Sequence, residues 1–134
     1  MRFKKGQEFR RRDLHAVFGG QEQGGISTPG DYPFIMLFMS ATGGDYGYTD
    51  RWTPDGVFHY TGEGQLGDQT FVRGNRQIRD HVELGKELHL FEYTRPGYVE
   101  YIGEFTYIGY HTRQAPDVQG NLRDVIVFEL KPID

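Results

Sequence analysis

Two strand-like segments separated by a short turn dominate the second half of the chain. Residues 87–94 alternate strictly between two faces, which is the two-residue period of a β-strand. After a turn at residues 95–97, residues 98–111 form a longer aromatic-rich segment that is interrupted by Gly103 and Gly109. Glycines inside a strand mark bulges or corners. The pair of segments therefore predicts a long β-hairpin within a curled sheet.

Three further segments have the character of strands. Residues 34–40 are almost wholly apolar, which predicts a strand covered on both faces, and residues 57–61 and 125–130 predict two more strands. The chain has 9 Tyr, 10 Phe, 1 Trp and 19 Gly but only 3 Met, which favours strands and turns over a helical bundle. We therefore expect an α+β, mainly β fold with a twisted, barrel-like sheet.

Two short helices complete the prediction. Residues 6–18 have a loosely helical apolar pattern that Gly19 ends. Residues 1–18 form a basic helix or arm, because six of the chain's 15 lysines and arginines occur there. The second helix is expected to begin with Asn75 as its cap, to bury Ile78, Val82 and Leu84, and to stop at Gly85.

Length and composition limit the classes of protein that this chain can belong to. Its 134 residues form one domain, and the absence of cysteine excludes disulfides and thiolate zinc sites. No run approaches 18 apolar residues, so we expect a cytoplasmic protein without a membrane role. The net charge of −4 argues against nonspecific coating of nucleic acid, unless positive charge is concentrated on one face.

Aromatic residues, carboxylates and glycines gather in the middle of the chain. Tyr48 and Tyr60 could sandwich a planar ring, and Asp50, or Asp45 as its reserve, could accept a hydrogen bond from an exocyclic amine such as that of cytosine. Glycine-rich turns let the backbone approach such a ring closely. These are the parts of a pocket for a base turned out of its helix. The alternative is that the tyrosines are half-buried sheet residues and the aspartates form turns.

An ordered series of residues resembles the pocket strand and following segment of SRA domains, which read modified cytosine. The series consists of Tyr48, Asp50, Tyr60-Thr61-Gly62-Glu63-Gly64, Asp68-Gln69 and Asn75-Arg76. The closest resemblance is to the N-terminal reader module of bacterial McrA-type HNH restriction endonucleases, and it implies a barrel of SRA/PUA type over residues 1–134. It also implies a role for each candidate residue. The base pocket would comprise Tyr48, Asp50, Tyr60, Thr61 and Gly62; Asp68 and Gln69 would brace it; and the DNA backbone would be contacted by Gly25, Ser27, Arg73, Asn75 and Arg76.

The expected function is binding of duplex DNA that carries 5-methylcytosine or 5-hydroxymethylcytosine, by flipping the base, in modification-dependent restriction. We expect no catalysis, metal or cofactor in these residues, because the five histidines form no metal motif and neither serine lies in a nucleophile elbow. An HNH endonuclease would be the missing remainder or a partner, and a homodimer is possible. The alternative function is an aromatic-lined barrel that binds RNA or carbohydrate.

Overall fold

The computed structural model describes residues 3–39 and 51–133, with the side chain of Arg51 excepted. The strands are β1 (Glu8–Arg10), β2 (Ile26–Ser27), β3 (Phe34–Met39), β4 (Arg51–Trp52), β5 (Phe58–Thr61), β6 (Glu87–Arg95), β7 (Tyr98–Pro116) and β8 (Leu122–Ile133). The helices are α1 (Arg11–Phe18) and α2 (Arg73–Arg79). The prediction of a mainly β, α+β fold with two short helices is confirmed for the described part of the chain.

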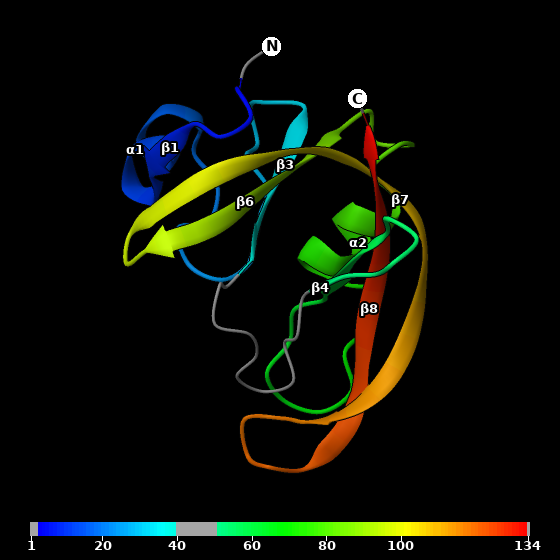
Figure 1. The fold of residues 1–134 in the computed structure, drawn as a ribbon. Coiled ribbons are helices and arrows are strands. Elements are labelled where there is room, and N and C mark those ends of the chain that lie inside the picture. Colours follow the sequence, from blue (N-terminus) through cyan, green and yellow to red (C-terminus); the bar gives the residue numbers. More distant parts are fainter. Residues whose placement is uncertain (1–2, 40–50, 134) are drawn as a thin grey trace.

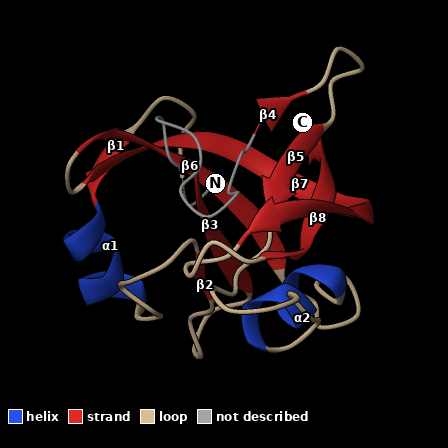
Figure 2. Cartoon of the chain, turned by 90° about the horizontal axis from the view of Figure 1, so that it is seen from below, coloured by secondary structure: helices blue, strands red, loops and turns tan. Residues whose placement is uncertain are grey.

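All of the described strands join one curled sheet. Its order is β2-β3-β6-β7-β8-β5-β4, and β1 pairs with β7 off this path. Only β3 and β6 run parallel to each other among the described strand pairs; the other pairs are antiparallel. Figure 1 shows β7 sweeping over the molecule before it turns back into β8, and Figure 2 shows α1 and α2 lying below the sheet, well apart from each other.

The long hairpin is confirmed, and it curls at the two glycines. The pairing of β6 with β7 shifts register next to Gly103, where Ile102 is the extra residue, and the pairing of β7 with β8 shifts next to Gly109, where Ile108 is extra. Each extra residue is a bulge that bends the strand and increases its twist. The curl that produces the barrel-like shape therefore originates at the positions that the sequence indicated.

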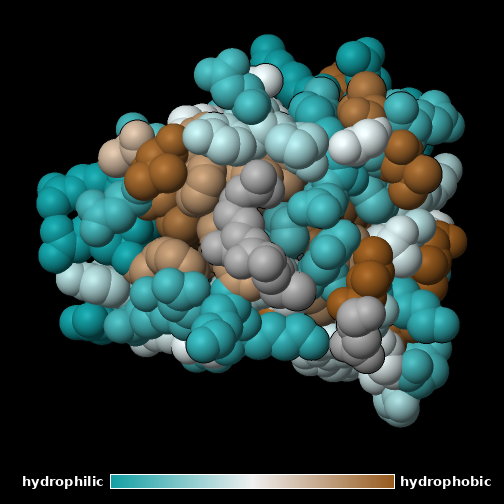
Figure 3. Space-filling model, turned by 90° about the horizontal axis from the view of Figure 1, so that it is seen from above, coloured by the Kyte–Doolittle hydropathy of each residue, from teal (hydrophilic) through white to brown (hydrophobic). Residues whose placement is uncertain are grey.

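Both faces of β3 are buried, as predicted. Ile35 and Leu37 pack into one apolar cluster with residues of β5, β8 and α2, whereas Phe34, Met36 and Phe38 pack into a second cluster with α1 and β6. The central strands therefore divide two cores, one on each side of the sheet. Viewed from above, the hydrophobic residues that remain at the surface form separate patches among hydrophilic ones (Figure 3).

Both predicted helices are present, but their bounds differ from the prediction. The N-terminal helix ends at Phe18 before Gly19 as predicted, but it begins only at Arg11, because Phe3 is buried in the second cluster and residues 8–10 pair with β7. The second helix ends at Arg79, and Val82 and Leu84 lie exposed in the turns that follow it. Among the described residues, no helix has the length and apolar character needed to cross a membrane.

Candidate functional site

A cavity of about 780 Å³ opens where the end of β5, the start of α2 and the loop before β2 meet. Part of its lining comes from the glycine-rich series that the sequence singled out. The lining residues used below are Arg11, Gly25, Phe38, Tyr60, Thr61, Gly62, Glu63, Asp68, Gln69, Arg73, Asn75 and Tyr93. The cavity therefore brings together segments that are distant in the sequence.

Tyr60 forms part of the cavity wall and is only 2% exposed. Its hydroxyl donates to the carbonyl oxygens of Gly25 and Phe38, at 2.7 and 3.1 Å. A Cβ at position 25 would lie 2.6 Å from the Tyr60 hydroxyl, so only glycine permits this approach. The tyrosine is thus held between two backbone segments. Most of its ring is buried in the first apolar cluster, called the inner core below, and a small part borders the cavity.

The chain leaves β5 through Thr61 and Gly62, both buried. The Gly62 N–H donates to the Ile126 carbonyl at 2.8 Å, which keeps the turn attached to β8. A Cβ at position 62 would lie 2.8 Å from Asn75 Oδ1 and 3.2 Å from the Phe128 ring. Close packing therefore requires glycine at this point of the cavity wall.

Gln69 and Asp68 make side-chain-to-backbone hydrogen bonds of the predicted kind. Gln69 Nε2 donates to the carbonyls of Gly62 and Gly64, and its Oε1 accepts from the Ile126 N–H. Asp68 Oδ1 accepts from the Asp124 N–H at 2.8 Å. The buried Gln69 side chain therefore attaches the cavity turn to β8. The exposed Asp68 side chain attaches the loop of residues 64–68 to β8 at Asp124.

Asn75 does not cap α2, which corrects the prediction. The helix begins at Arg73, and Asn75 is buried inside its first turn. Its Oδ1 accepts from the Glu63 N–H, while its Nδ2 donates to the carbonyls of Glu63 and Thr70. These three bonds explain the difference, because the loop that packs on the helix occupies both donors of the amide and its oxygen.

The residues predicted to contact the DNA backbone differ in accessibility. Ser27 is fully buried in β2 and Asn75 is 1% exposed, so neither side chain reaches the surface in this structure. Arg73 and Arg76 are exposed, and Arg73 also lines the cavity. Gly25 lies at the rim, where its main chain is half-buried.

Three predicted or reserve pocket residues fall outside the described part of the chain. Tyr48 and Asp50, and the reserve Asp45, lie within residues 40–50. The proposed second stacking ring and the proposed amine acceptor therefore remain predictions.

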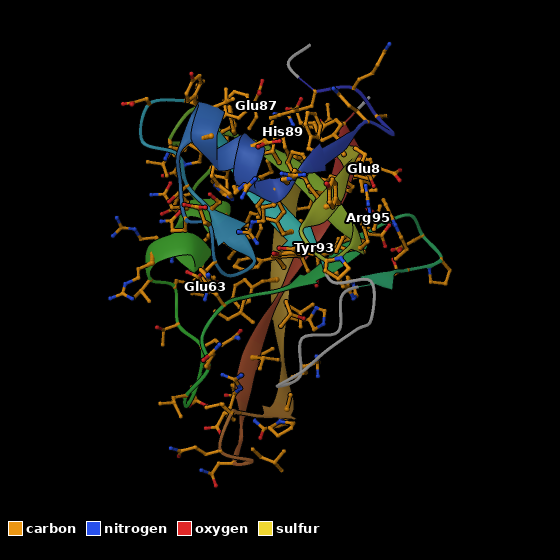
Figure 4. The ribbon with its side chains drawn as sticks, turned by 90° about the vertical axis from the view of Figure 1, so that its left-hand side faces the viewer. Glu8, Glu63, Glu87, His89, Tyr93 and Arg95 are labelled. Atoms are coloured by element: carbon orange, nitrogen blue, oxygen red, sulfur yellow. The ribbon has the colours of Figure 1, made fainter. Side chains whose placement is uncertain are left out.

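Glu63 is a cavity residue whose importance the sequence analysis missed. It lies beside α2 (Figure 4), and its Oε2 accepts from the Gly74 N–H at 3.0 Å. Burial raises the pKa of its carboxyl, while the Gly74 hydrogen bond and the charge of Arg73 act in the opposite direction. Its position between Gly62 and Gly64 in the candidate series was the signal that could have found it.

We expect Glu63 to make the protein less stable as the pH rises. A carboxyl whose pKa is higher in the folded state contributes stability at low pH and loses it as the pH rises through the folded pKa. The free energy of unfolding should therefore fall as the pH rises above the ordinary value of 4.5. Denaturant titrations between pH 4 and 8 should show this fall to be smaller in Glu63→Gln, but unchanged in Glu83→Gln, an exposed glutamate. If the free energy of unfolding changed with pH equally in wild type and Glu63→Gln, this expectation would be wrong.

A buried arginine, Arg11, also lines the cavity, and its sequence pattern gave no sign of this role. Arg11 lies with its guanidinium carbon 3.8 Å from the Phe38 ring centroid, and it donates to the Tyr93 hydroxyl at 2.7 Å and to His15 Nε2 at 3.0 Å. Burial lowers the pKa of His15, and the Arg11 charge acts in the same direction. Arg11 and Tyr93 also line a second hollow of about 480 Å³, together with Arg10 and Arg12. The two hollows thus share Arg11 and Tyr93, and three arginines line the second one.

Comparison with known proteins gives a consistent family assignment. The family model described as "ScoMcrA-like, SRA domain" matches residues 5–134. Comparison with curated proteins gives no match.

Three solved structures illustrate the fold. The sulfur-binding and SRA domains of ScoMcrA complexed with phosphorothioated DNA match at 24% identity with a TM-score of 0.79. The type IV phosphorothioation-dependent restriction endonuclease ScoMcrA matches at 23% with a TM-score of 0.78. The SRA domain of SUVH5 complexed with hemimethylated CG DNA matches at 23% with a TM-score of 0.70.

The coverage differs between these relatives. Each match spans 99% of this chain, but the chain spans only 40% and 28% of the two ScoMcrA chains, against 90% of the SUVH5 chain. The likenesses establish the SRA fold that the resemblance implied. With the family model matching residues 5–134, the chain belongs to the ScoMcrA-like SRA domain family.

Proposed function

We propose that this domain binds duplex DNA and takes a 5-modified cytosine, rotated out of the helix, into the cavity beside Tyr60. One observation carries the proposal. The tyrosine, the buried Thr61-Gly62 turn and the start of α2 border a single cavity of about 780 Å³. Among the relatives, SUVH5 SRA domains are complexed with methylated or hydroxymethylated DNA, which supports the same ligand class here.

The cavity supplies the interactions that a flipped base needs. An aromatic ring stacks on a base, and backbone groups of a closely approaching turn can bond to its polar edge. Unstacking and unpairing cost a few kcal/mol, and stacking returns roughly 1–3 kcal/mol per base. In this proposal the base contacts the part of the Tyr60 ring that borders the cavity, the main chain at Thr61 and Gly62 lies beside the Watson–Crick edge, and Tyr48 and Asp50 contribute the second ring and the amine acceptor.

In this proposal two exposed arginines hold the DNA backbone. Arg73 stands at both the cavity and the start of α2, and Arg76 follows one turn later. Because the chain has a net charge of −4, affinity for DNA must depend on a local concentration of positive charge rather than on the total. The basic hollow around Arg10, Arg11 and Arg12 adjoins the cavity through Arg11 and extends this local charge.

A titration with matched duplexes tests the proposal. The labelled duplexes are identical except at one position, which carries cytosine, 5-methylcytosine or 5-hydroxymethylcytosine; a fourth carries one phosphorothioate link. We expect tighter binding to a 5-modified duplex than to the plain duplex. Equal affinity for all four, or preference for structured RNA or an oligosaccharide added to the panel, would refute it.

Arg73 and Arg76 should control the salt dependence of binding. Each phosphate contact that is lost should reduce the slope of log K against log salt by about 1, without changing the preference among bases. Fluorescence titrations at several salt concentrations should show this for Arg73→Gln and Arg76→Gln. Lys131→Gln is the matched control, because Lys131 is exposed on β8 and lines neither hollow. An unchanged slope in both arginine variants would remove them from the interface.

The biological role follows from the family as part of the same proposal. One relative is a restriction endonuclease that depends on a DNA modification, and this chain spans 28% of its length. We infer that the domain directs an HNH nuclease, on the same polypeptide or on a partner, to modified DNA. Cleavage of modified plasmid by the full-length protein, and its loss when the reader cavity is mutated, would test this role.

A further inference from the structure

Two histidines and one glutamate meet on the outer face of three adjacent strands. His59 lies on β5, Glu129 on β8 and His111 on β7, and β8 is the middle strand. His59 is directly opposite Glu129 in the β5–β8 register. The flanking residues Phe58, Tyr60, Phe128 and Leu130 are all buried in the inner core, so the alternation of side chains directs His59 and Glu129 to the other face.

The three side chains converge closely. One nitrogen or oxygen from each can be chosen so that all three atoms lie within 4.8 Å of one another. His111 Nδ1 lies 2.7 Å from Glu129 Oε2, and the two imidazole rings are 5.0 Å apart between centroids. Position 109 lies opposite Glu129 on β7 and is glycine, so no side chain from that position separates the carboxylate from the histidines.

We propose that His59, His111 and Glu129 form a zinc-binding site. Two imidazoles and one carboxylate are a known zinc ligand set, with bonds of about 2.0–2.2 Å. Ligand atoms of a tetrahedral site lie roughly 3.3 Å apart, so small side-chain rotations bring these three to a common ion. Calcium and magnesium are disfavoured because they prefer oxygen ligands. The His111 and Glu129 side chains are 41% and 31% exposed, which leaves room for water to complete the coordination.

A simple ion pair is the competing explanation for the contact between His111 and Glu129. It requires one imidazole only, whereas here a second imidazole faces the same carboxylate from the neighbouring strand. A bound ion would join β5, β8 and β7 at the residue that precedes Tyr60. It would therefore stabilise the strand that forms the cavity wall. The inference rests on these three side chains alone and does not depend on DNA binding.

The test measures zinc binding directly on protein that has been stripped with a chelator and exchanged into chelator-free buffer. Calorimetric titration with zinc chloride should show one ion per chain, and cobalt substituted for zinc should give visible absorption bands. His59→Gln, His111→Gln and Glu129→Gln should each weaken binding by roughly 10-fold or more, since losing even an outer-shell partner commonly costs that much. Glu104→Gln, a β7 glutamate outside the cluster, should bind as wild type does.

Thermal unfolding supplies a second measurement. A ligand that binds only the folded state stabilises it, so zinc should raise the Tm of wild type and of Glu104→Gln but not of the three ligand variants. Without zinc, the variants should unfold within a few degrees of wild type, because the side chains are partly exposed. Failure of wild type to bind zinc, or equal binding by the variants, would overturn the site and leave His111 and Glu129 as an ion pair.

Discussion

Replacing Tyr60 by leucine should remove the preference for 5-modified cytosine while leaving a weak, salt-dependent affinity for any duplex. Leucine keeps an apolar side chain in the inner core but has no ring on which a base can stack. The lost stacking of roughly 1–3 kcal/mol corresponds to about 5- to 150-fold in affinity for the modified duplex. Fluorescence titration of modified and plain duplexes with both proteins measures the difference.

Tyr60→Phe separates stacking from scaffold effects. It keeps the ring but removes the hydroxyl that bonds to the carbonyls of Gly25 and Phe38. We expect a stability loss of about 1 kcal/mol and nearly unchanged discrimination between duplexes. If Tyr60→Leu is folded, as judged by circular dichroism, and still prefers the modified duplex as strongly as wild type does, Tyr60 does not stack on the base.

The sequence predicted the curled hairpin because glycine and alternation are local signals. Gly103 and Gly109 lie beside two of the three register shifts in the pairings of β7, and the alternating residues 87–94 do lie in a strand. The parallel pairing of β3 with β6 was not predictable in the same way. It depends on how two segments about 50 residues apart come together. The residue pattern of each strand does not indicate which other strand will pair with it.

The site was predictable where its residues are adjacent in the sequence. Tyr60, Thr61 and Gly62 form one turn, and Gln69 lies close enough to brace it. Arg11 reaches the cavity from another element, and the burial of Glu63 beside the Gly74 N–H depends on how α2 packs against the turn. The proposed zinc ligands come from three strands, so no motif of fixed spacing could indicate them.

The error at Asn75 has a physical cause that also makes it the most sensitive scaffold position. Capping preference treats the residue as a partner of its own helix. Here the amide instead bonds three main-chain groups, those of Glu63 N, Glu63 O and Thr70 O, and is 1% exposed. The helix start and the cavity turn are thus held together by one side chain.

Asn75→Ala should therefore cost roughly 3 kcal/mol or more of stability. Each buried polar group left without a partner costs about 1–3 kcal/mol, and alanine leaves the Glu63 N–H and two carbonyls in that condition. Urea or thermal unfolding measures the loss. Because the cavity turn loses its attachment to α2, the variant should also bind modified duplex more weakly than wild type at a temperature where both are folded.

Gln77→Ala is the matched control for this prediction. Gln77 is on the same helix and its Oε1 accepts from Lys86 Nζ, but it is only partly buried. Removing that contact should cost about 1 kcal/mol or less, since partly exposed interactions contribute little. If Asn75→Ala is no less stable than Gln77→Ala, the amide does not hold the turn. The geometry of the cavity wall would then depend on Gln69 and the β5–β8 pairing instead.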